Sequence, residues 1–282
     1  MYKRQFLLLF VVGIFTIFQG CAEQESLAES PVDYVDPFIG TGTSTTASTL
    51  QHSVSDTEPK GQTFPAVGMP FGMTHWTPQT RATEQKCVSP YYYDDDEIQG
   101  FRGSHWMSGS CTQDYGSVTI MPVTGPVTTS AEAWGSSFQH RTETATPAYY
   151  SVDLDDYDIT MEVTGTERSA IMQFRYHEAD SATILIHPNS DENQGHVEFY
   201  PELNAVVGYN PVHRIYQGWG EPSGFSGHFV ILFEDTFSTY GTWEDDEIIP
   251  GRDLADGGCS ADVRTCVKLP FNSDCMVRLR MG

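Results

Sequence analysis

The sequence predicts an all-β protein, folded as one large two-sheet antiparallel β-sandwich. From Ser117 onward, short runs of alternating or β-branched residues are separated by Gly and Pro turns, as is typical of strands joined by hairpins. No segment of helical length carries apolar residues at spacings of three and four between capping residues. The 282 residues are enough for one large sandwich core.

The predicted strands are short and separated by turn residues. In residues 169–176 every second residue is apolar or aromatic, with Ile171 as the exception, so one face of that strand should be buried. The strands that we predict are 117–124, 159–164, 169–176, 182–187, 205–209, 225–233, 237–243 and 275–281. Residues 33–115 differ, because they are rich in Gly, Ser, Thr and Pro and carry aromatic residues singly rather than in alternation.

The N-terminus has the pattern of a secretory signal. Two basic residues precede an apolar run at 6–18, which is too short to span a bilayer, and Gly-Cys follows at 20–21. That ending resembles a bacterial lipobox, so we expect Cys21 to be lipidated, although Phe18 replaces the usual Leu. An ordinary cleaved signal is the alternative. We divide the chain into a signal peptide at 1–20, a flexible linker at 21–32 and the β-sandwich at 33–282.

This pattern predicts a bacterial protein that is secreted across the inner membrane and resides in the periplasm or at the cell surface. We expect it to contact the membrane only through the lipid. The net charge of −23, from 15 basic and 38 acidic residues, excludes binding to nucleic-acid phosphates and disfavours anionic membrane surfaces. Neutral polar ligands, cations and sugars remain.

Five cysteines follow Cys21, an odd number, so at least one is free or pairs with another chain. Their spacing matches no zinc ribbon and no C-x-x-C redox motif, and it leaves the disulfide pairing open. The five are Cys87, Cys111, Cys259, Cys266 and Cys275.

The segment 100–116 is the strongest candidate for a ligand-binding loop. It places His105, Trp106 and Asp114 among Gly and Ser residues, with little strand or helix periodicity. Sugars stack on aromatic rings and bind Arg, Asp and His through their hydroxyls. Trp76, Arg81 and the tyrosines at 91–93 complete such a set. The alternative is that these aromatic residues pack in the core, and the Gly and Ser neighbours argue against it for Trp106.

No nucleophile motif, phosphate-binding loop or calcium-binding loop motif is present in the sequence. Acidic residues cluster at 94–97, 153–158 and 244–247, and we interpret these clusters as solvated turns. A glycosidase needs two carboxyl groups facing each other across a bond, and closeness in sequence does not supply that geometry.

Several motifs, in this order, resemble the N-terminal domain of glycoside hydrolase family 92, whose members are bacterial, mostly exo-acting, calcium-dependent α-mannosidases. They are Val-Asp-Pro-Phe-Ile-Gly at 35–40, Thr-Phe-Pro at 63–65, Pro-Phe-Gly-Met at 70–73, Thr-Pro-Gln-Thr-Arg at 77–81, Gly-Phe at 100–101, Ser-Gly-Ser-Cys at 108–111, Asp-Tyr-Gly at 114–116 and Met-Pro at 121–122.

The resemblance implies that this β-sandwich packs on a C-terminal (α/α)6 barrel, which is absent from this chain. Hydrolysis would be inverting, with the catalytic carboxylates and most Ca2+ ligands in the barrel and no catalytic residue here. By motif position, Arg81 would bind a mannose hydroxyl, His105 and Trp106 would contact the sugar, and Asp114 would order the loop or contact substrate. The expected substrate is an α-mannoside oligosaccharide or N-glycan, cleaved at α-1,2 bonds.

Two other functions remain open on the residues alone. A stand-alone carbohydrate-binding module needs only the sandwich and its aromatic residues. A structural or adhesion sandwich needs no ligand pocket. The strand-like segment 276–281 ends one residue before the last residue, so we expect the chain to be a piece of a longer protein, which favours the mannosidase.

Overall fold

The computed structural model describes most of the chain from Ser30 onward. The described residues are 30–47, 61–81, 89–106, 114, 116–177, 181–189, 194–213, 222–234, 236, 239–244, 247–251, 254–255, 262–267 and 274–281. The chain divides into two compact units, Met1–Tyr34 and Val35–Gly282. In the first unit, the described part is a 3-10 helix, η1 (Pro31–Tyr34), where the Ser30 N–H donates to the Asp33 carboxylate at 2.7 Å.

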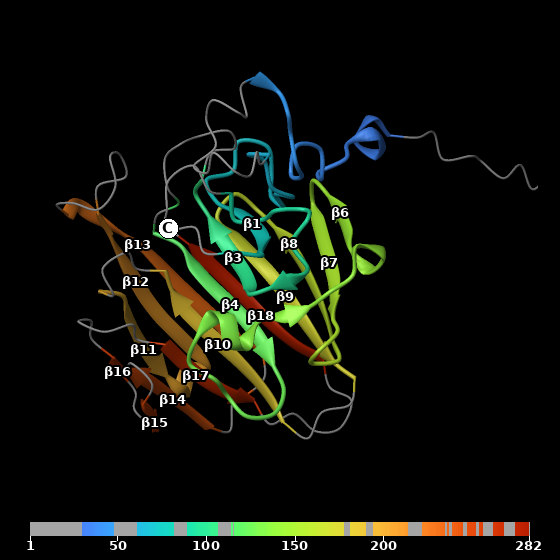
Figure 1. The fold of residues 1–282 in the computed structure, drawn as a ribbon. Helices are drawn as coiled ribbons and strands as arrows, with labels where there is room; N and C mark the ends of the chain where they lie inside the picture. Colours follow the sequence, from blue (N-terminus) through green and yellow to red (C-terminus); the bar gives the residue numbers. More distant parts are fainter. Residues whose placement is uncertain are drawn as a thin grey trace, which may run out of the picture. The chain divides into compact units, whose positions relative to one another are not determined.

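In the second unit, nine of the described strands form one antiparallel sheet (Figure 1). In spatial order they are β16 (Leu254–Ala255), β11 (His196–Tyr200), β12 (Ala205–His213), β13 (Pro222–Phe233), β18 (Asp274–Met281), β9 (Ser169–Tyr176), β8 (Ile159–Gly165), β7 (Tyr149–Leu154) and β6 (Thr144–Thr146). Four of these strands, β6 to β9, follow one another along the chain as a meander.

A second sheet has seven of the described strands. Its order is β1 (His75–Gln79), β3 (Gly100–Ser104), β4 (Val118–Val123), β10 (Ala182–Pro188), β17 (Asp262–Val267), β14 (Thr239–Glu244) and β15 (Glu247–Pro250). The strands β2 (Glu97–Ile98) and β5 (Ser136–Ser137) pair separately. Among the described residues of this unit, the helical segments are α3 (Ala131–Trp134), η2 (His140–Thr142) and η3 (Pro201–Leu203).

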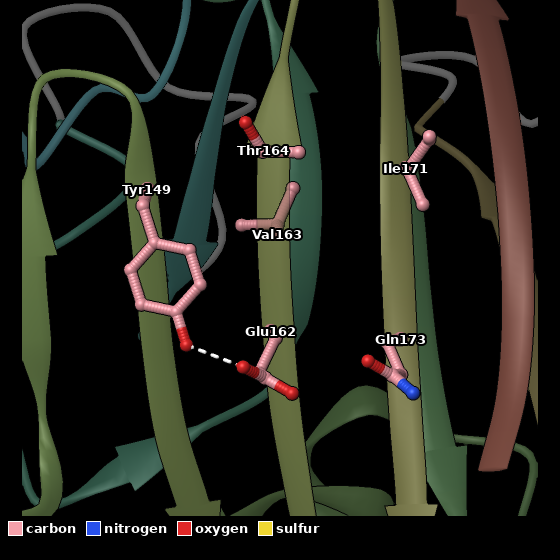
Figure 2. Close-up of a pocket in the computed structure, with 6 residues that line it drawn as sticks. All are labelled: Tyr149, Glu162, Val163, Thr164, Ile171 and Gln173. Carbon is pink, nitrogen blue, oxygen red and sulfur yellow. Dashed lines mark hydrogen bonds between the residues drawn. The ribbon is translucent and has the colours of Figure 1, made fainter.

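The hydrophobic core contains residues from both large sheets, such as Ile120 and Ile184 from one and Met161 and Phe174 from the other. In β7 to β9, buried positions alternate with more exposed ones, so only one face of the nine-stranded sheet packs inward. Figure 2 looks onto the outer face of these strands. The strand β4 is instead buried at every position, as expected for a strand covered on both sides.

The predicted fold class is confirmed, and each of the eight predicted segments overlaps a strand, but strands such as β7, β11 and β17 were not predicted. The predicted segments 159–164, 169–176 and 182–187 correspond to β8, β9 and β10. The interpretation of all of 100–116 as a loop is wrong at its start, because Gly100–Ser104 forms β3 between β1 and β4. All five residues of β3 are buried, so the strand shows no alternation that the sequence could reveal.

Several predictions fall outside the described residues. These include the signal segment 1–20, most of the linker, the lipidation site Cys21, and Cys87, Cys111 and Cys259. Among the residues that the structure does describe, no helix is long and apolar enough to cross a membrane.

Candidate functional site

The predicted sugar-binding residues lie at two ends of the antiparallel pair β1 and β3. Gln79, at the end of β1, pairs with Gly100, at the start of β3. Arg81 lies two residues beyond Gln79, whereas His105 and Trp106 follow the end of β3. The paired strands are five residues long, which separates their ends by about 13 Å. The structure therefore places Arg81 at one end of the pair and His105 with Trp106 at the other.

Arg81 is held by a carboxylate on one side and an aromatic ring on another. Its Nε donates to Asp95 Oδ2 at 2.8 Å, and its Nη2 donates to the other carboxylate oxygen. Its guanidinium carbon lies 4.7 Å from the centre of the Tyr92 ring. Thr80 also donates its hydroxyl to Asp95, at 2.7 Å. Asp95 therefore positions Arg81, and the interpretation of the whole 94–97 cluster as a solvated turn is wrong at this residue.

Trp106 packs into an aromatic cluster rather than lying on the surface. Its side chain is 2% exposed, and its ring centre lies 5.8 Å from that of Phe64. Tyr91 completes the cluster. The expectation that Gly and Ser neighbours keep Trp106 out of the core is therefore wrong, because aromatic residues from distant segments cover it. Its contact with a sugar stays a prediction.

Asp114 connects His105 to a buried arginine. Its Oδ1 accepts a hydrogen bond from the His105 backbone N–H at 3.0 Å, and its Oδ2 lies 3.6 Å from Arg102 Nε. Both side chains of this ion pair are almost wholly buried. The His105 ring lies near Thr74 Oγ1, at 3.4 Å from Nε2. Burial, and then the proximity of His105, lower the pKa of His75. Asp114 thus orders the start of the segment that follows β3.

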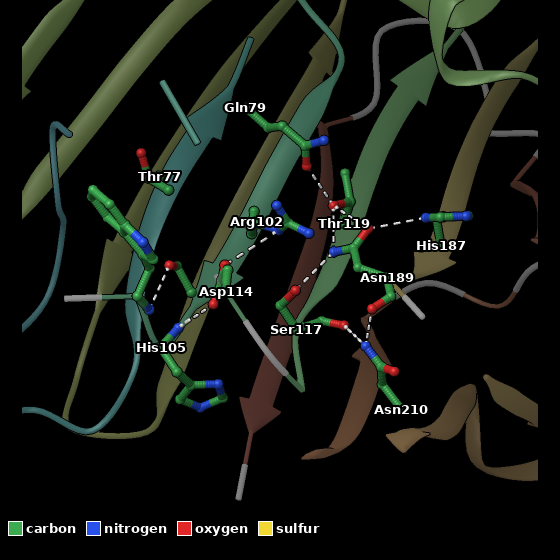
Figure 3. A network of polar contacts seen from close by, with 12 residues as sticks. Thr77, Gln79, Arg102, His105, Asp114, Ser117, Thr119, His187, Asn189 and Asn210 are labelled. Carbon is green, nitrogen blue, oxygen red and sulfur yellow. Dashed lines mark hydrogen bonds and ion pairs between the residues drawn. The ribbon is translucent and has the colours of Figure 1, made fainter. Parts of the chain in front are cut away.

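A network of buried polar groups continues from Arg102 into the sandwich (Figure 3). Asn189 lies at its centre, and the amide orientation that satisfies its neighbours puts Oδ1 at 2.8 Å from Arg102 Nη2. In that orientation the Asn189 amide nitrogen donates to Thr119 Oγ1 at 3.1 Å, and the Thr119 hydroxyl donates to Gln79 at 2.7 Å. Asn210 donates to the backbone carbonyl of Asn189. Arg102 was not among the predicted site residues, and its only signal in the sequence is a charge within the Gly-containing strand β3.

A second buried network surrounds Glu143, whose side chain is 1% exposed. Tyr150 donates its hydroxyl to this carboxylate at 2.6 Å and Tyr91 at 3.1 Å, while His140 Nδ1 lies 2.5 Å away. Burial, followed by the charge of Glu143, raises the pKa of Tyr91 and that of Tyr150 well above the ordinary value for tyrosine. Both hydroxyls therefore keep donating to Glu143 even at pH values where an exposed tyrosine begins to ionise.

Tyr93 is the aromatic residue of the predicted set that reaches the surface, with 37% of its side chain exposed. It stacks on the His140 ring, with ring centres 3.9 Å apart and planes at 4°. In contrast, Trp76, Tyr91 and Tyr92 are buried, so packing in the core is the correct interpretation for these three. Tyr93 is thus a better candidate than Trp106 for stacking on a sugar.

The comparisons with known proteins agree with this architecture. A family model described as the glycosyl hydrolase family 92 N-terminal domain matches residues 34–282. The chain belongs to this family. Family membership confirms the resemblance carried by the motifs between residues 35 and 122. Among proteins with curated descriptions, none matches the chain by sequence.

Solved structures of the family share the fold. The family 92 inverting mannosidase BT2199 of Bacteroides thetaiotaomicron is 25% identical, with a TM-score of 0.74 over 90% of this chain and 32% of its own. The family 92 α-mannosidase BT3965 of the same organism is 22% identical, with a TM-score of 0.72 over 90% of this chain and 33% of its own. The chain therefore spans about a third of the length of these relatives.

The described residues show no group of three His, Cys, Asp or Glu side chains that could hold a metal ion. The networks around Arg102 and Glu143 each contain one carboxylate, and that carboxylate already has protein partners. These two networks therefore do not offer a set of free carboxylates to a calcium ion.

Proposed function

We propose that this chain is the N-terminal part of a secreted, exo-acting, inverting α-mannosidase and supplies part of its mannose-binding subsite. The observation that carries the proposal is the family match over residues 34–282, together with the likeness to an inverting mannosidase about three times as long. The substrate would be an α-mannoside oligosaccharide or N-glycan, with a preference for α-1,2 bonds. The catalytic carboxylates and the Ca2+ ligands would lie mainly in the remainder of the protein.

Within the subsite, we assign Arg81 the binding of a sugar hydroxyl. Asp95 and Tyr92 fix the guanidinium in place, so little side-chain entropy is lost when a ligand binds. Asp114 acts on the other end of the strand pair, where it holds the backbone of His105 and keeps that imidazole next to Thr74. His105 and Trp106 remain predicted sugar contacts, but about 13 Å separates the two ends of the strand pair, so they would not contact the same sugar ring as Arg81.

An exposed apolar turn at residues 69–73, directly before β1, supports the proposal that this chain packs against a further domain. Phe71 is fully exposed, and its φ of 63° is a strained value for an aromatic residue. Met69 and Met73 beside it are also exposed. The turn is nevertheless pinned, because the Met73 N–H donates to the Glu167 carbonyl at 2.8 Å. A rigid, exposed apolar tip is typical of an interface, so we propose that it packs on the C-terminal catalytic domain.

Secretion and a lipid anchor complete the proposal. They rest on the basic residues, the apolar run at 6–18 and Cys21, which together predict a periplasmic or cell-surface lipoprotein. Metabolic labelling with a radioactive fatty acid should modify the wild-type protein and spare Cys21→Ser. Equal labelling of both proteins would exclude Cys21 as the lipidated residue.

Hydrolysis of an aryl α-mannoside in the presence of Ca2+ tests whether the catalytic groups lie outside this chain. We expect this chain alone to show no turnover, and the full-length protein to hydrolyse the substrate with inversion. Arg81→Ala in the full-length protein should raise KM, whereas Arg81→Lys keeps the charge and should raise it less. Turnover by the isolated chain would overturn the proposal. Mannoside binding without turnover in the full-length protein would instead support a carbohydrate-binding module.

A further inference from the structure

The outer face of the nine-stranded sheet carries a shallow depression that the proposed mannose subsite does not use. It has a volume of about 140 Å³ and opens on the strands β7, β8 and β9 (Figure 2). Its lining residues are Tyr149, Glu162, Val163, Thr164, Ile171 and Gln173. The subsite residues belong instead to the ends of β1 and β3 in the other sheet.

Strand register arranges the outward-facing side chains of this region in two rows. One row has an aromatic residue at one end and an aliphatic residue at the other, and the second row is wholly polar. The first row is Tyr149, Thr164 and Ile171, and the second is Ser151, Glu162 and Gln173. Neighbouring strands lie about 4.8 Å apart, so the two rows together form a patch about as wide as a sugar ring and its hydroxyls.

The Tyr149 ring lies flat against the sheet, with one face toward solvent (Figure 2). Its hydroxyl donates to Glu162 Oε1 at 2.5 Å, which fixes the orientation of the ring. Burial, and then the hydrogen bond to Glu162, raise the pKa of Tyr149. Ile171 lies across the depression and is 40% exposed. An immobilised aromatic face is therefore available beside a polar row.

The polar row provides both hydrogen-bond donors and acceptors. Glu162 Oε2 lies 3.5 Å from Arg175 Nη2, and the amide of Gln173 is opposite Glu162 in the register. A carboxylate, an amide and a guanidinium next to an aromatic face match the chemistry of a pyranose, which has a flat C–H face and a rim of hydroxyls. The net charge of −23 disfavours sulfated or uronic acid polymers.

We propose that this depression is a second glycan-binding site, in which Tyr149 stacks on a pyranose ring of a neutral glycan while Glu162 and Gln173 bind its hydroxyls. The site is separate from the mannose subsite and does not depend on the mannosidase assignment. Two sites on one chain would hold the protein on a polymeric or branched glycan, because the second contact forms at a high effective concentration.

Affinity electrophoresis of this chain in native gels tests the site, with yeast α-mannan and a soluble neutral β-glucan as separate probes. We expect at least one of them to retard the wild-type chain. Tyr149→Ala should weaken that binding about tenfold, the effect of losing one stacked aromatic contact. Tyr149→Phe keeps the ring and should weaken it less. Because Tyr149 lies on the solvent face, Tyr149→Ala should keep the wild-type melting temperature to within a few degrees, about what 1 kcal/mol shifts.

Two outcomes would overturn the proposal. One is that neither polysaccharide retards the wild-type chain. The other is that Tyr149→Ala binds as well as wild type while Arg81→Ala does not, which would place all glycan binding at the mannose subsite. The reverse pattern, with Tyr149→Ala impaired and Arg81→Ala unchanged, supports the second site even if the mannosidase proposal fails.

Discussion

Replacing Asp114 by Ala tests whether this residue orders the segment after β3 or acts only on substrate. The substitution removes the acceptor of the His105 N–H, 3.0 Å away, and the partner of the Arg102 guanidinium, 3.6 Å away. Both charged side chains are almost wholly buried, so Arg102 would keep its charge in the interior without the carboxylate. If the role is structural, the fold itself must lose stability in the absence of any sugar.

The expected loss in the free energy of unfolding is about 3–4 kcal/mol. Removing one partner of a buried ion pair costs about 3–5 kcal/mol, and the lost hydrogen bond to His105 adds about 1 kcal/mol. The separation of 3.6 Å between Asp114 and Arg102 exceeds that of a close charge-assisted hydrogen bond, which places the ion-pair term at the lower end. Asp114→Asn keeps an acceptor for the His105 N–H and should therefore destabilise less.

Equilibrium unfolding in urea measures this loss, as a lower midpoint at an unchanged slope. Asp96→Ala is the matched control, because that carboxylate is exposed and its removal should change stability by at most about 0.5 kcal/mol. The double variant Arg102→Met/Asp114→Ala should recover part of the loss, since no unpaired charge stays buried. If Asp114→Ala lost less than about 1 kcal/mol, close to the change in the control, the ordering role would be refuted.

Three further predictions concern the two networks. Gly100→Ala should destabilise by about 2–3 kcal/mol in urea, because φ is 151° there and a new Cβ would lie 2.4 Å from Thr119 Cγ2; an unchanged midpoint would show that the strand relaxes freely. Glu143→Ala should lower stability by about 3–5 kcal/mol in the same assay, more than Glu143→Gln, which keeps an acceptor for the hydroxyls. The raised pKa of Tyr150 means that the unfolded chain ionises first as pH rises above about 10, so stability falls with pH there. In thermal melts from about pH 8 to about pH 11, Tyr150→Phe should show a shallower fall than wild type, and parallel curves would contradict this linkage.

The predicted strands include some with one buried face, such as β8 and β9, and some buried almost throughout, such as β4 and β10, whereas the alternating strands β7 and β11 were not predicted. In β8 and β9 buried and more exposed positions alternate, so a period of two is visible in the residues themselves. The strands β1 and β3 are buried almost throughout and contain Gly, Pro and Arg, so they carry no such signal. Their pairing comes from hydrogen bonds between segments 25 residues apart.

At the candidate site, too, the sequence did not predict which single residues are buried or paired. Local composition placed Trp106 in a permissive loop, but Phe64 and Tyr91, which are distant in the chain, bury it. Likewise, Asp95 looked like part of a solvated acidic turn until its contact with Arg81 was known. Burial depends on which distant residues cover a side chain, and nearest neighbours in the sequence do not determine that.

The sequence by itself determined the all-β sandwich and the family, since strand periodicity and the order of motifs are properties of the chain read in one direction. The tertiary structure alone decided that Asp114 pairs with buried Arg102 and that Glu143 forms hydrogen bonds with two tyrosines and a histidine. It also decided that Arg81 and His105 lie at opposite ends of one strand pair. The physical reason is that ion pairing and burial are set by contacts across the sandwich, between residues that the chain itself keeps far apart.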